Sequence, residues 1–123
     1  MSGAALSKWG FVLAAALVLD AEAASKSKTP KMYNGAIAYH RESHSWGYAV
    51  NKPTAREAQV EALKQCAHER CEVVMHLRNN CGSVADGPRR FFVGSGANRQ
   101  ESETKALRAC GAGCQIAAWA CTR

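Results

Sequence analysis

The chain has 123 residues, which is enough for one domain and too few for two of ordinary size. Lysine and arginine number 16 against 10 aspartate and glutamate residues, so the formal net charge is +6. This balance favours acidic partners, such as nucleic acid, anionic lipid or polysaccharide, or an acidic protein face. A solvated basic surface explains the same charge, because the basic side chains after residue 31 are dispersed along the chain.

An apolar run near the amino terminus predicts a cleavable secretion signal. Trp9–Leu19 is an uninterrupted run of 11 apolar residues that follows Lys8, whereas a helix that spans a bilayer needs about 20. Ala21-Glu22-Ala23 supplies the small-x-small pattern of a signal peptidase site. We expect a signal peptide over residues 1–23, with cleavage after Ala24 as an alternative. A short buried helix is the other interpretation of this run.

Export would leave a short basic tail followed by one domain. Residues 24–32 are polar and basic, and we expect this tail to be disordered. Residues 33–123 then form a single domain, and the mature chain carries 15 basic and 8 acidic side chains, a net charge of +7. The first cysteine, Cys66, lies far from the cleavage site, so we expect neither a lipid anchor nor a membrane anchor. The predicted location is secreted or periplasmic.

Two segments of the domain align without a gap and indicate an internal repeat. Arg56–Cys66 matches Gln100–Cys110, and each segment is followed by a short loop, a second cysteine and an apolar run. Both segments place small and apolar residues on one stripe, as amphipathic helices do. Thr54 and Asn98 each precede a glutamate by three residues, which is the spacing of N-terminal helix caps. The repeat therefore predicts two equivalent helices.

Apolar segments on either side of each helix predict strands. Val73, Met75 and Leu77 are expected to share one face of their strand, with His76 on the opposite, exposed face. Each unit, about residues 33–79 and 80–121, reads as strand, strand, helix, strand. We expect an α+β domain of tandem β-β-α-β units with a pseudo-twofold axis, in which two helices lie on an antiparallel-rich sheet. The predicted strands are Gly35–Tyr39, Trp46–Val50, Cys71–Leu77, Cys81–Ala85, Arg90–Gly94 and Cys114–Ala120.

Six cysteines behind an export signal predict three disulfides. The sequence contains no Cys-x-x-Cys pair, so neither a zinc site nor a thioredoxin-like site is supported. Six cysteines allow 15 pairings, and the repeat selects among them. Pairing Cys66–Cys71 and Cys110–Cys114 joins the end of each helix to the following strand and treats both units alike. The remaining pair, Cys81–Cys121, is then expected to tie the end of one unit to the end of the other.

Three features together resemble the domain-of-unknown-function 4189 family. They are the opening strand Gly35–Tyr39, the strand that begins Trp46-Gly47-Tyr48, and the doubled Ala-Leu-x-x-Cys helix with its following cysteine strand. The resemblance covers about residues 33–121. It implies a small secreted or periplasmic bacterial domain, and it assigns no activity and no catalytic or ligand-binding residue. Phe91–Gly94 departs from the Trp-Gly strand that the family pattern leads us to expect before the second helix.

One turn contains residues that suggest catalysis. His40, Arg41 and His44 are close in sequence, and two imidazoles could perform acid–base chemistry on a phosphodiester while Arg41 holds the anion. A polar, exposed turn is the favoured alternative, because the second unit has no equivalent cluster. No nucleophile elbow and no phosphate-binding glycine loop is found. We therefore expect no cofactor and no metal.

Aromatic and arginine side chains support a binding function. The second strands of both units are rich in aromatic residues, and Arg89 and Arg90 lie at the start of the second of these strands. Phe91 and Phe92 are adjacent, so they point to opposite faces. An exposed aromatic beside arginine suits a protein interface or stacking on single-stranded nucleic acid; the alternative is a core beneath the helices. The candidate binding residues are Trp46, Tyr48, Arg89, Arg90, Phe91 and Phe92.

The sequence favours a binding domain over an enzyme. Its partner is expected to be another protein, as in an inhibitor-like or immunity-like domain. One alternative is a small basic hydrolase that acts on a polyanion such as RNA, and another is a structural component of the cell envelope. The sequence does not determine the oligomeric state.

Overall fold

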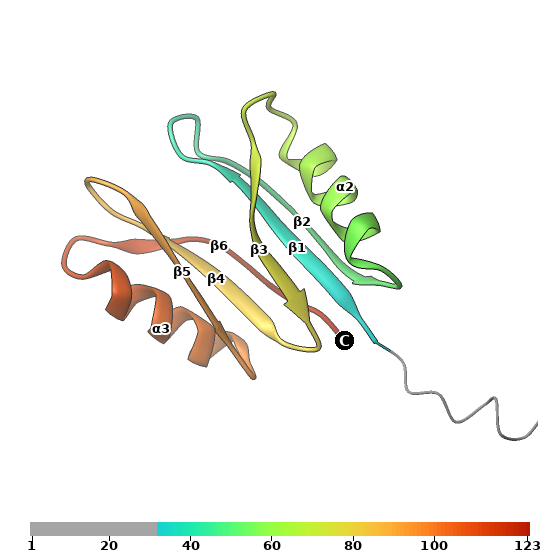
Figure 1. Cartoon of the computed structure of the whole chain (residues 1–123). Helices are drawn as coiled ribbons and strands as arrows, with labels where there is room; N and C mark the ends of the chain where they lie inside the picture. The colour runs from blue at the N-terminus through green and yellow to red at the C-terminus, as the bar shows by residue number, and fades with distance from the viewer. Residues whose placement is uncertain (1–31) are drawn as a thin grey trace, which may run out of the picture. The chain divides into compact units, whose positions relative to one another are not determined.

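Two β-β-α-β units follow one another along the chain, as the repeat predicts (Figure 1). The computed structural model describes residues 32–123, so the predicted signal peptide (1–23) and residues 24–31 of the predicted tail lie outside the described residues. The first unit contains β1 (Asn34–His40), β2 (Ser45–Lys52), α2 (Ala55–Cys66) and β3 (Glu72–Arg78). The second contains β4 (Cys81–Asp86), β5 (Phe91–Gly96), α3 (Arg99–Cys110) and β6 (Gln115–Cys121).

Both helices begin at the predicted caps. The Thr54 hydroxyl accepts a hydrogen bond from the Glu57 backbone N–H at 3.1 Å, and the Asn98 side chain accepts one from the Glu101 backbone N–H at 2.8 Å. Each side chain satisfies a backbone donor that the first turn of a helix leaves without an intrahelical partner. The two helices have 12 residues each, which confirms the prediction of equivalent elements.

The strands form two three-stranded antiparallel sheets, with the orders β2-β1-β3 and β5-β4-β6. The tandem units, the helices and the antiparallel pairing are confirmed, whereas the strands divide between two sheets and do not join in one. β1 and β4 each occupy the centre of a sheet, and both of their hydrogen-bonding edges pair within their own unit.

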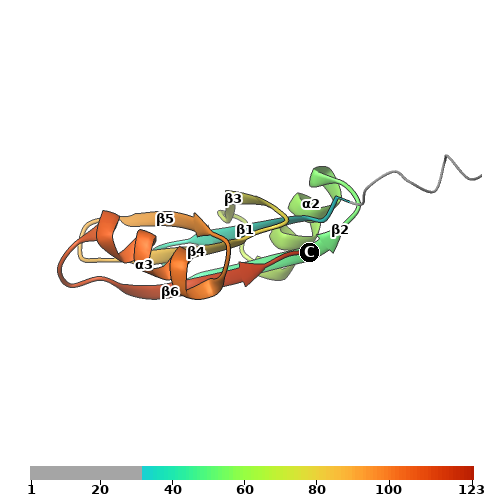
Figure 2. The same cartoon turned by 90° about the horizontal axis from the view of Figure 1, so that it is seen from below.

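The two sheets pack against each other, and each helix covers the outer face of its own sheet. Figure 2, a view from below, shows α3 beside the strands of the second unit and α2 beside β1 and β2. Small side chains such as Ala36, Ala58 and Ala62 form the contact between α2 and its sheet, which brings the helix close to the strands. The inner core between the sheets contains Ile37, Tyr39, Met75, Leu77, Val84, Ala118 and Ala120.

A β-bulge occurs at the same place in both units. Ile37 pairs with Met75 and its neighbour Ala38 pairs with Val73, so Val74 is the extra residue of β3. Ala117 is the extra residue at the matching position of β6. A bulge interrupts the alternation of side chains, and the prediction that Val73, Met75 and Leu77 share a face is therefore wrong. Val74 packs against the inner core, and Val73 packs on the α2 side.

The contact between α3 and its sheet contains a pair of buried hydroxyls. Ser83 and Ser102 have no exposed surface and are hydrogen-bonded at 2.6 Å, and the Ser102 hydroxyl is also 2.9 Å from the Arg99 carbonyl oxygen. In the first unit two alanines, Ala36 and Ala58, occupy the matching positions. The fold therefore accepts either a bonded pair of hydroxyls or two methyl groups at this contact.

This pair gives the first prediction. Ser102→Ala should reduce the free energy of unfolding by about 1–3 kcal/mol, because the buried Ser83 hydroxyl then loses its partner. The double variant Ser83→Ala/Ser102→Ala should be close to wild type, because replacing both partners by apolar groups of similar shape is nearly neutral. Urea denaturation of the three proteins measures this. A double variant that is less stable than Ser102→Ala would contradict the equivalence of the two units.

Disulfides join Cys66 to Cys71, Cys110 to Cys114 and Cys81 to Cys121, which is the pairing that the repeat predicts. The expected role of the third bridge is wrong. Cys81 and Cys121 are register partners on β4 and β6, so the bridge lies within the second sheet and does not tie one unit to the other. The end of the chain is instead attached to the first unit by hydrogen bonds, one of which runs from the Asn51 backbone N–H to the Thr122 hydroxyl at 2.7 Å.

Candidate functional site

A network of side chains joins the two units at the ends of the central strands. Tyr39 is near the end of β1 and donates a hydrogen bond to Asp86 Oδ2, at the end of β4, at 2.5 Å. Arg41 Nε donates to Asp86 Oδ1 at 2.8 Å, and Arg41 Nη2 donates to the Gly87 carbonyl oxygen at 2.6 Å. The turn after β1 is therefore held against the turn after β4.

The network fixes the charge of its members. Burial favours the neutral form of Asp86, but the hydrogen bonds from Tyr39 and Arg41 and the charge of Arg41 outweigh it and lower the pKa of this carboxyl below its ordinary value. Burial, and then the hydrogen bond to Asp86, raises the pKa of the Tyr39 hydroxyl well above its ordinary value. At neutral pH, Asp86 is thus an anion balanced by Arg41, and Tyr39 is a neutral donor.

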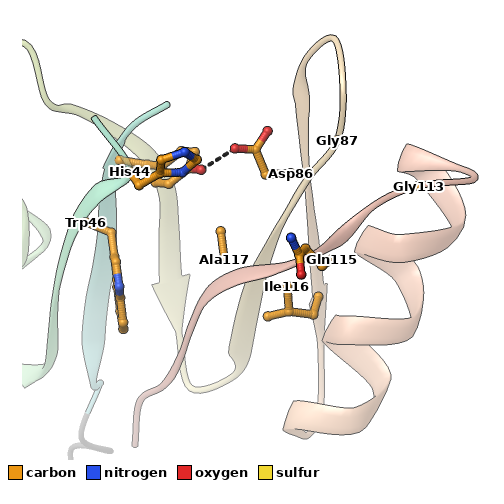
Figure 3. A pocket seen from close by; sticks show the side chains of 9 residues that line it. His44, Trp46, Asp86, Gly87, Gly113, Gln115, Ile116 and Ala117 are labelled. Carbon is orange, nitrogen blue, oxygen red and sulfur yellow. Dashed lines mark hydrogen bonds between the residues drawn. The ribbon is translucent and has the colours of Figure 1, made fainter. Parts of the chain in front are cut away.

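A cavity of about 300 Å³ opens beside this network (Figure 3). Trp46 of β2 stands on one side, and Gln115, Ile116 and Ala117 of β6 stand on the other. The dashed line in Figure 3 marks the Tyr39–Asp86 hydrogen bond at the end of the cavity. The complete lining is Tyr39, His44, Trp46, Asp86, Gly87, Gly113, Gln115, Ile116 and Ala117.

The cavity lies where the two units differ. Tyr39 pairs with Trp46 across β1 and β2, and Asp86 pairs with Phe91 across β4 and β5, so Tyr39 matches Asp86 and Trp46 matches Phe91. On one side of the inner core, the rings of Tyr39 and Phe91 meet edge to face, with centroids 5.4 Å apart. On the other side the matching residues are Asp86 and Trp46, and the shorter Asp86 leaves the space unfilled.

Trp46, which lines the cavity, is stacked with a second exposed aromatic ring. Trp46 and Tyr48 lie on the edge strand β2, with their ring centroids 5.7 Å apart and an interplanar angle of 26°. Their exposed fractions are 38% and 41%, although both alternate with residues that pack against α2. Large aromatic side chains that stay this exposed on a rigid strand form a preorganised contact surface.

A second cavity, of about 290 Å³, contains the predicted arginines. It is lined in part by Arg89, Arg90 and Phe92, and the Arg90 guanidinium lies 5.0 Å from the centre of the Phe92 ring. Gly87 lines both cavities, so they adjoin at the β4–β5 turn. Phe91 points inward and packs against the inner core, opposite to Phe92 as the alternation predicts.

The histidines of the first turn do not share a cavity. His40 stacks on His68 at 4.2 Å and pairs with Glu42 at 3.1 Å, beside a separate hollow lined by Glu69 and Arg70. His44 lines the first cavity. Arg41 turns toward Asp86, so the three side chains do not converge on one substrate position.

His76 is exposed, as its strand position predicts, and lies 3.4 Å from Gln59 of α2.

Within residues 32–123, no group of three or more His, Cys, Asp or Glu side chains is arranged to hold a metal ion. In the same part of the chain, no helix has both the length and the apolar character needed to cross a bilayer.

Tyr39 and Asp86 are site residues that the sequence alone did not indicate. Asp86 ends the first strand of its unit and Tyr39 is the last residue but one of the other, and only the alignment of these strands would have placed a ring opposite a carboxylate. Their hydrogen bond joins residues 47 positions apart, and no local sequence pattern predicts it.

The lowered pKa of Asp86 gives a pH prediction. Its ionised form stabilises the folded state, so this contribution is present above the usual carboxyl pKa of about 4 and is lost as the pH falls below it. Asp86→Asn should reduce the free energy of unfolding by about 2 kcal/mol at pH 7 and should flatten its decline between pH 5 and pH 2. Urea denaturation across this range measures both effects. Glu42→Gln, at an exposed carboxyl, is the control and should keep the wild-type profile; an Asp86→Asn profile parallel to wild type would contradict the prediction.

Comparisons with known proteins give relatives without an assigned activity. A family model described as "Domain of unknown function (DUF4189)" matches residues 34–121. Protein Rv1269c of Mycobacterium tuberculosis is 36% identical over 87 residues, which cover 71% of this chain and 68% of that protein. Uncharacterized protein Rv1813c of the same organism is 33% identical over 104 residues, or 85% and 71% of the two chains. The NMR structure of Rv1813c is similar with a TM-score of 0.58 at 32% identity, and the match covers 76% of this chain and 78% of that one.

Proposed function

The chain belongs to the DUF4189 family of domains of unknown function, and from this premise we propose that it is an exported binding domain whose partner is another protein. Three disulfides in a domain of this size are typical of proteins outside the reducing cytosol. The apolar run at residues 9–19 supports a secretion signal, and the proposed location is secreted or periplasmic.

The observation that carries the proposal is the exposed pair Trp46 and Tyr48. Tryptophan, tyrosine and arginine are enriched at the energetic centres of protein interfaces. Here the two rings stack on a strand that is fixed by α2 on its other face. Trp46 lines the first cavity together with Asp86, which is the partly buried ion-pair partner of Arg41. Apolar contact area next to fixed hydrogen-bonding groups is the usual composition of a specific interface. An inhibitor-like or immunity-like domain is one concrete form.

A basic surface supports a second candidate, the binding of a polyanion. Arg89 and Arg90 are exposed and lie beside Phe92 in the adjoining cavity. Arginine and an aromatic ring in one hollow suit phosphate contact and base stacking. Hydrolysis of the polyanion receives less support, because His40 and His44 lie at different hollows.

Capture from the native cell envelope and culture fractions tests the proposal. We expect the oxidised domain to retain one protein through a high-salt wash. Trp46→Ala/Tyr48→Ala should reduce its retention about 30-fold, because truncation of central aromatics typically costs 2 kcal/mol or more. Val93→Ala is the matched control: Val93 has a similar exposed fraction, 39%, on β5 of the second unit. Its retention should equal that of wild type.

Two results would contradict a protein partner. In the first, the double aromatic variant retains the same protein as well as wild type does. In the second, only nucleic acid or polysaccharide is captured and is released as the salt concentration rises. Arg89→Ala/Arg90→Ala should then abolish that capture, which would support the polyanion candidate.

A further inference from the structure

The geometry points to an aromatic side chain of the partner protein, a tyrosine in particular, as the group that occupies the cavity between Trp46 and Asp86. This inference rests on the proposed protein-binding function and specifies what the partner inserts. It follows from the difference between the two halves of the inner core, from the size of the cavity and from the charges at its end.

On the side of the inner core opposite the cavity, side chains of the protein itself fill the corresponding space. On the opposite side of the inner core, the Tyr39 ring meets the Phe91 ring edge to face at 84°. Trp46 is the register match of Phe91, so it offers an aromatic surface in the same relation to the sheets. Asp86 is the register match of Tyr39, and it lacks the ring. A ring supplied by the partner would restore on this side the contact that the chain makes internally on the other.

The strands β3 and β6 also differ, and the smaller residue again lies on the cavity side. Val74 is the bulge residue of β3 and packs against the inner core on the filled side. Its match on β6 is Ala117, which lines the cavity. At two of the three matched positions the cavity side has the smaller residue, whereas Trp46 is larger than Phe91 but stays 38% exposed. The resulting volume of about 300 Å³ is sufficient, since an apolar cavity of roughly 150 Å³ already holds benzene.

The polar end of the cavity favours a neutral ring with a hydroxyl over a cation. Asp86 is anionic, but the Arg41 guanidinium is 2.8 Å from its carboxylate and balances the charge. An incoming ammonium or guanidinium group would have to compete with Arg41. A carboxylate has about four lone-pair sites, and here Tyr39 and Arg41 each donate to one oxygen. Asp86 therefore retains capacity to accept a hydrogen bond from a phenol hydroxyl.

Nuclear magnetic resonance titration of the oxidised protein with three capped amino acids tests the inference without the partner. The probes are the N-acetyl amides of tyrosine, leucine and lysine. The tyrosine probe should shift the Trp46 indole and the Gly87 and Gly113 amide signals saturably. It should bind about fivefold more tightly than the leucine probe, because an edge-to-face aromatic contact adds to the burial of area.

Two variants separate the cavity from the exposed surface. Ala117→Val copies the residue that stands at the matching position of the filled side, and it should weaken the tyrosine probe about tenfold. Trp46→Ala should also weaken it, and this exposed position leaves the core intact. Val93→Ala is the control and should bind the probe as wild type does. Folding is checked from the amide spectrum of each variant.

The outcomes distinguish this inference from the proposed function. Equal affinity for the three probes, a preference for the lysine probe, or unchanged binding by Ala117→Val would overturn the aromatic occupant. If the Trp46→Ala/Tyr48→Ala variant nevertheless fails to retain the partner protein in the capture experiment, the proposed protein-binding function is still supported. Tyrosine-probe binding that Ala117→Val reduces, together with reduced capture of the partner by the same variant, would support both.

Discussion

Replacement of Gly47 by alanine is expected to reduce the free energy of unfolding by about 3 kcal/mol, the upper end of the usual cost of overpacking. A Cβ atom at this position would lie 2.3 Å from the Cys66 backbone nitrogen and 2.4 Å from the Ala62 carbonyl oxygen. Both atoms belong to the backbone of α2, so no side-chain rotation relieves the clash. The helix has to move away from β2, which separates the small residues that pack between them.

Thermal and urea denaturation measure this effect. A loss of 3 kcal/mol corresponds to a fall in Tm of more than about 10 °C for a domain of this size. Gly94→Ala should behave similarly, since its Cβ would lie 2.5 Å from the Ala106 backbone nitrogen of α3. Ser95→Ala, at an exposed position next to Gly94 on β5, is the control and should keep a stability close to that of wild type. A Gly47→Ala variant as stable as the Ser95→Ala variant would contradict the close approach.

Gly47 also links stability to the candidate site. It lies between Trp46 and Tyr48, and its lack of a side chain lets α2 cover that face of β2 while both rings project from the other face. A variant that displaces α2 should therefore lose partner capture as well as stability. In Gly94→Ala, the destabilised contact belongs to the other unit, so a comparison at matched stability separates the two effects.

Removal of the Cys81–Cys121 bridge is expected to cost about 4 kcal/mol, because the loop that it closes in the unfolded chain spans 40 residues. Removal of Cys66–Cys71, with a sequence separation of 5, should cost about 2 kcal/mol. A typical domain has only about 5–15 kcal/mol of net stability. The longer bridge therefore contributes a large share of what keeps the domain folded.

Paired alanine variants measure the two bridges separately. Cys81→Ala/Cys121→Ala and Cys66→Ala/Cys71→Ala each remove one disulfide without leaving a free thiol that could exchange. Urea denaturation under oxidising conditions should rank the first variant as the less stable. The opposite order would mean that the local bridges, which hold each helix to the following strand, contribute more than loop closure predicts.

The elements and the disulfide pairing could be predicted because their signals are local and occur twice. The caps at Thr54 and Asn98, the helix stripes and the cysteines that follow each helix lie within short stretches of sequence. The pairing followed because Cys66 and Cys110 hold the same place in the repeat. Each of these inferences needed only the alignment of the two helices.

The candidate site depends on relations that the helix alignment does not give. The loops of the two units differ in length, so the strands cannot be aligned from the helices alone, and the match of Tyr39 with Asp86 was not visible. The bulges at Val74 and Ala117 shift which side chains face inward. The division into two sheets was missed for a related reason, since pairing between β1 and β3 requires the register of distant segments. Trp46 and Tyr48 could be nominated because large aromatics on an edge strand remain candidates whatever the register.

All three disulfides lie inside one unit or the other, and none crosses between them. The two halves are joined covalently only through the short β3–β4 connection. Otherwise they are held by the inner core, by the Tyr39, Arg41 and Asp86 network, and by the hydrogen bonds between Asn51 and the end of the chain. An exchange of halves between two chains would therefore break non-covalent contacts alone, and oxidation would not prevent it. A domain-swapped dimer formed in this way would keep every disulfide and would carry two copies of the Trp46 cavity, each built from two chains.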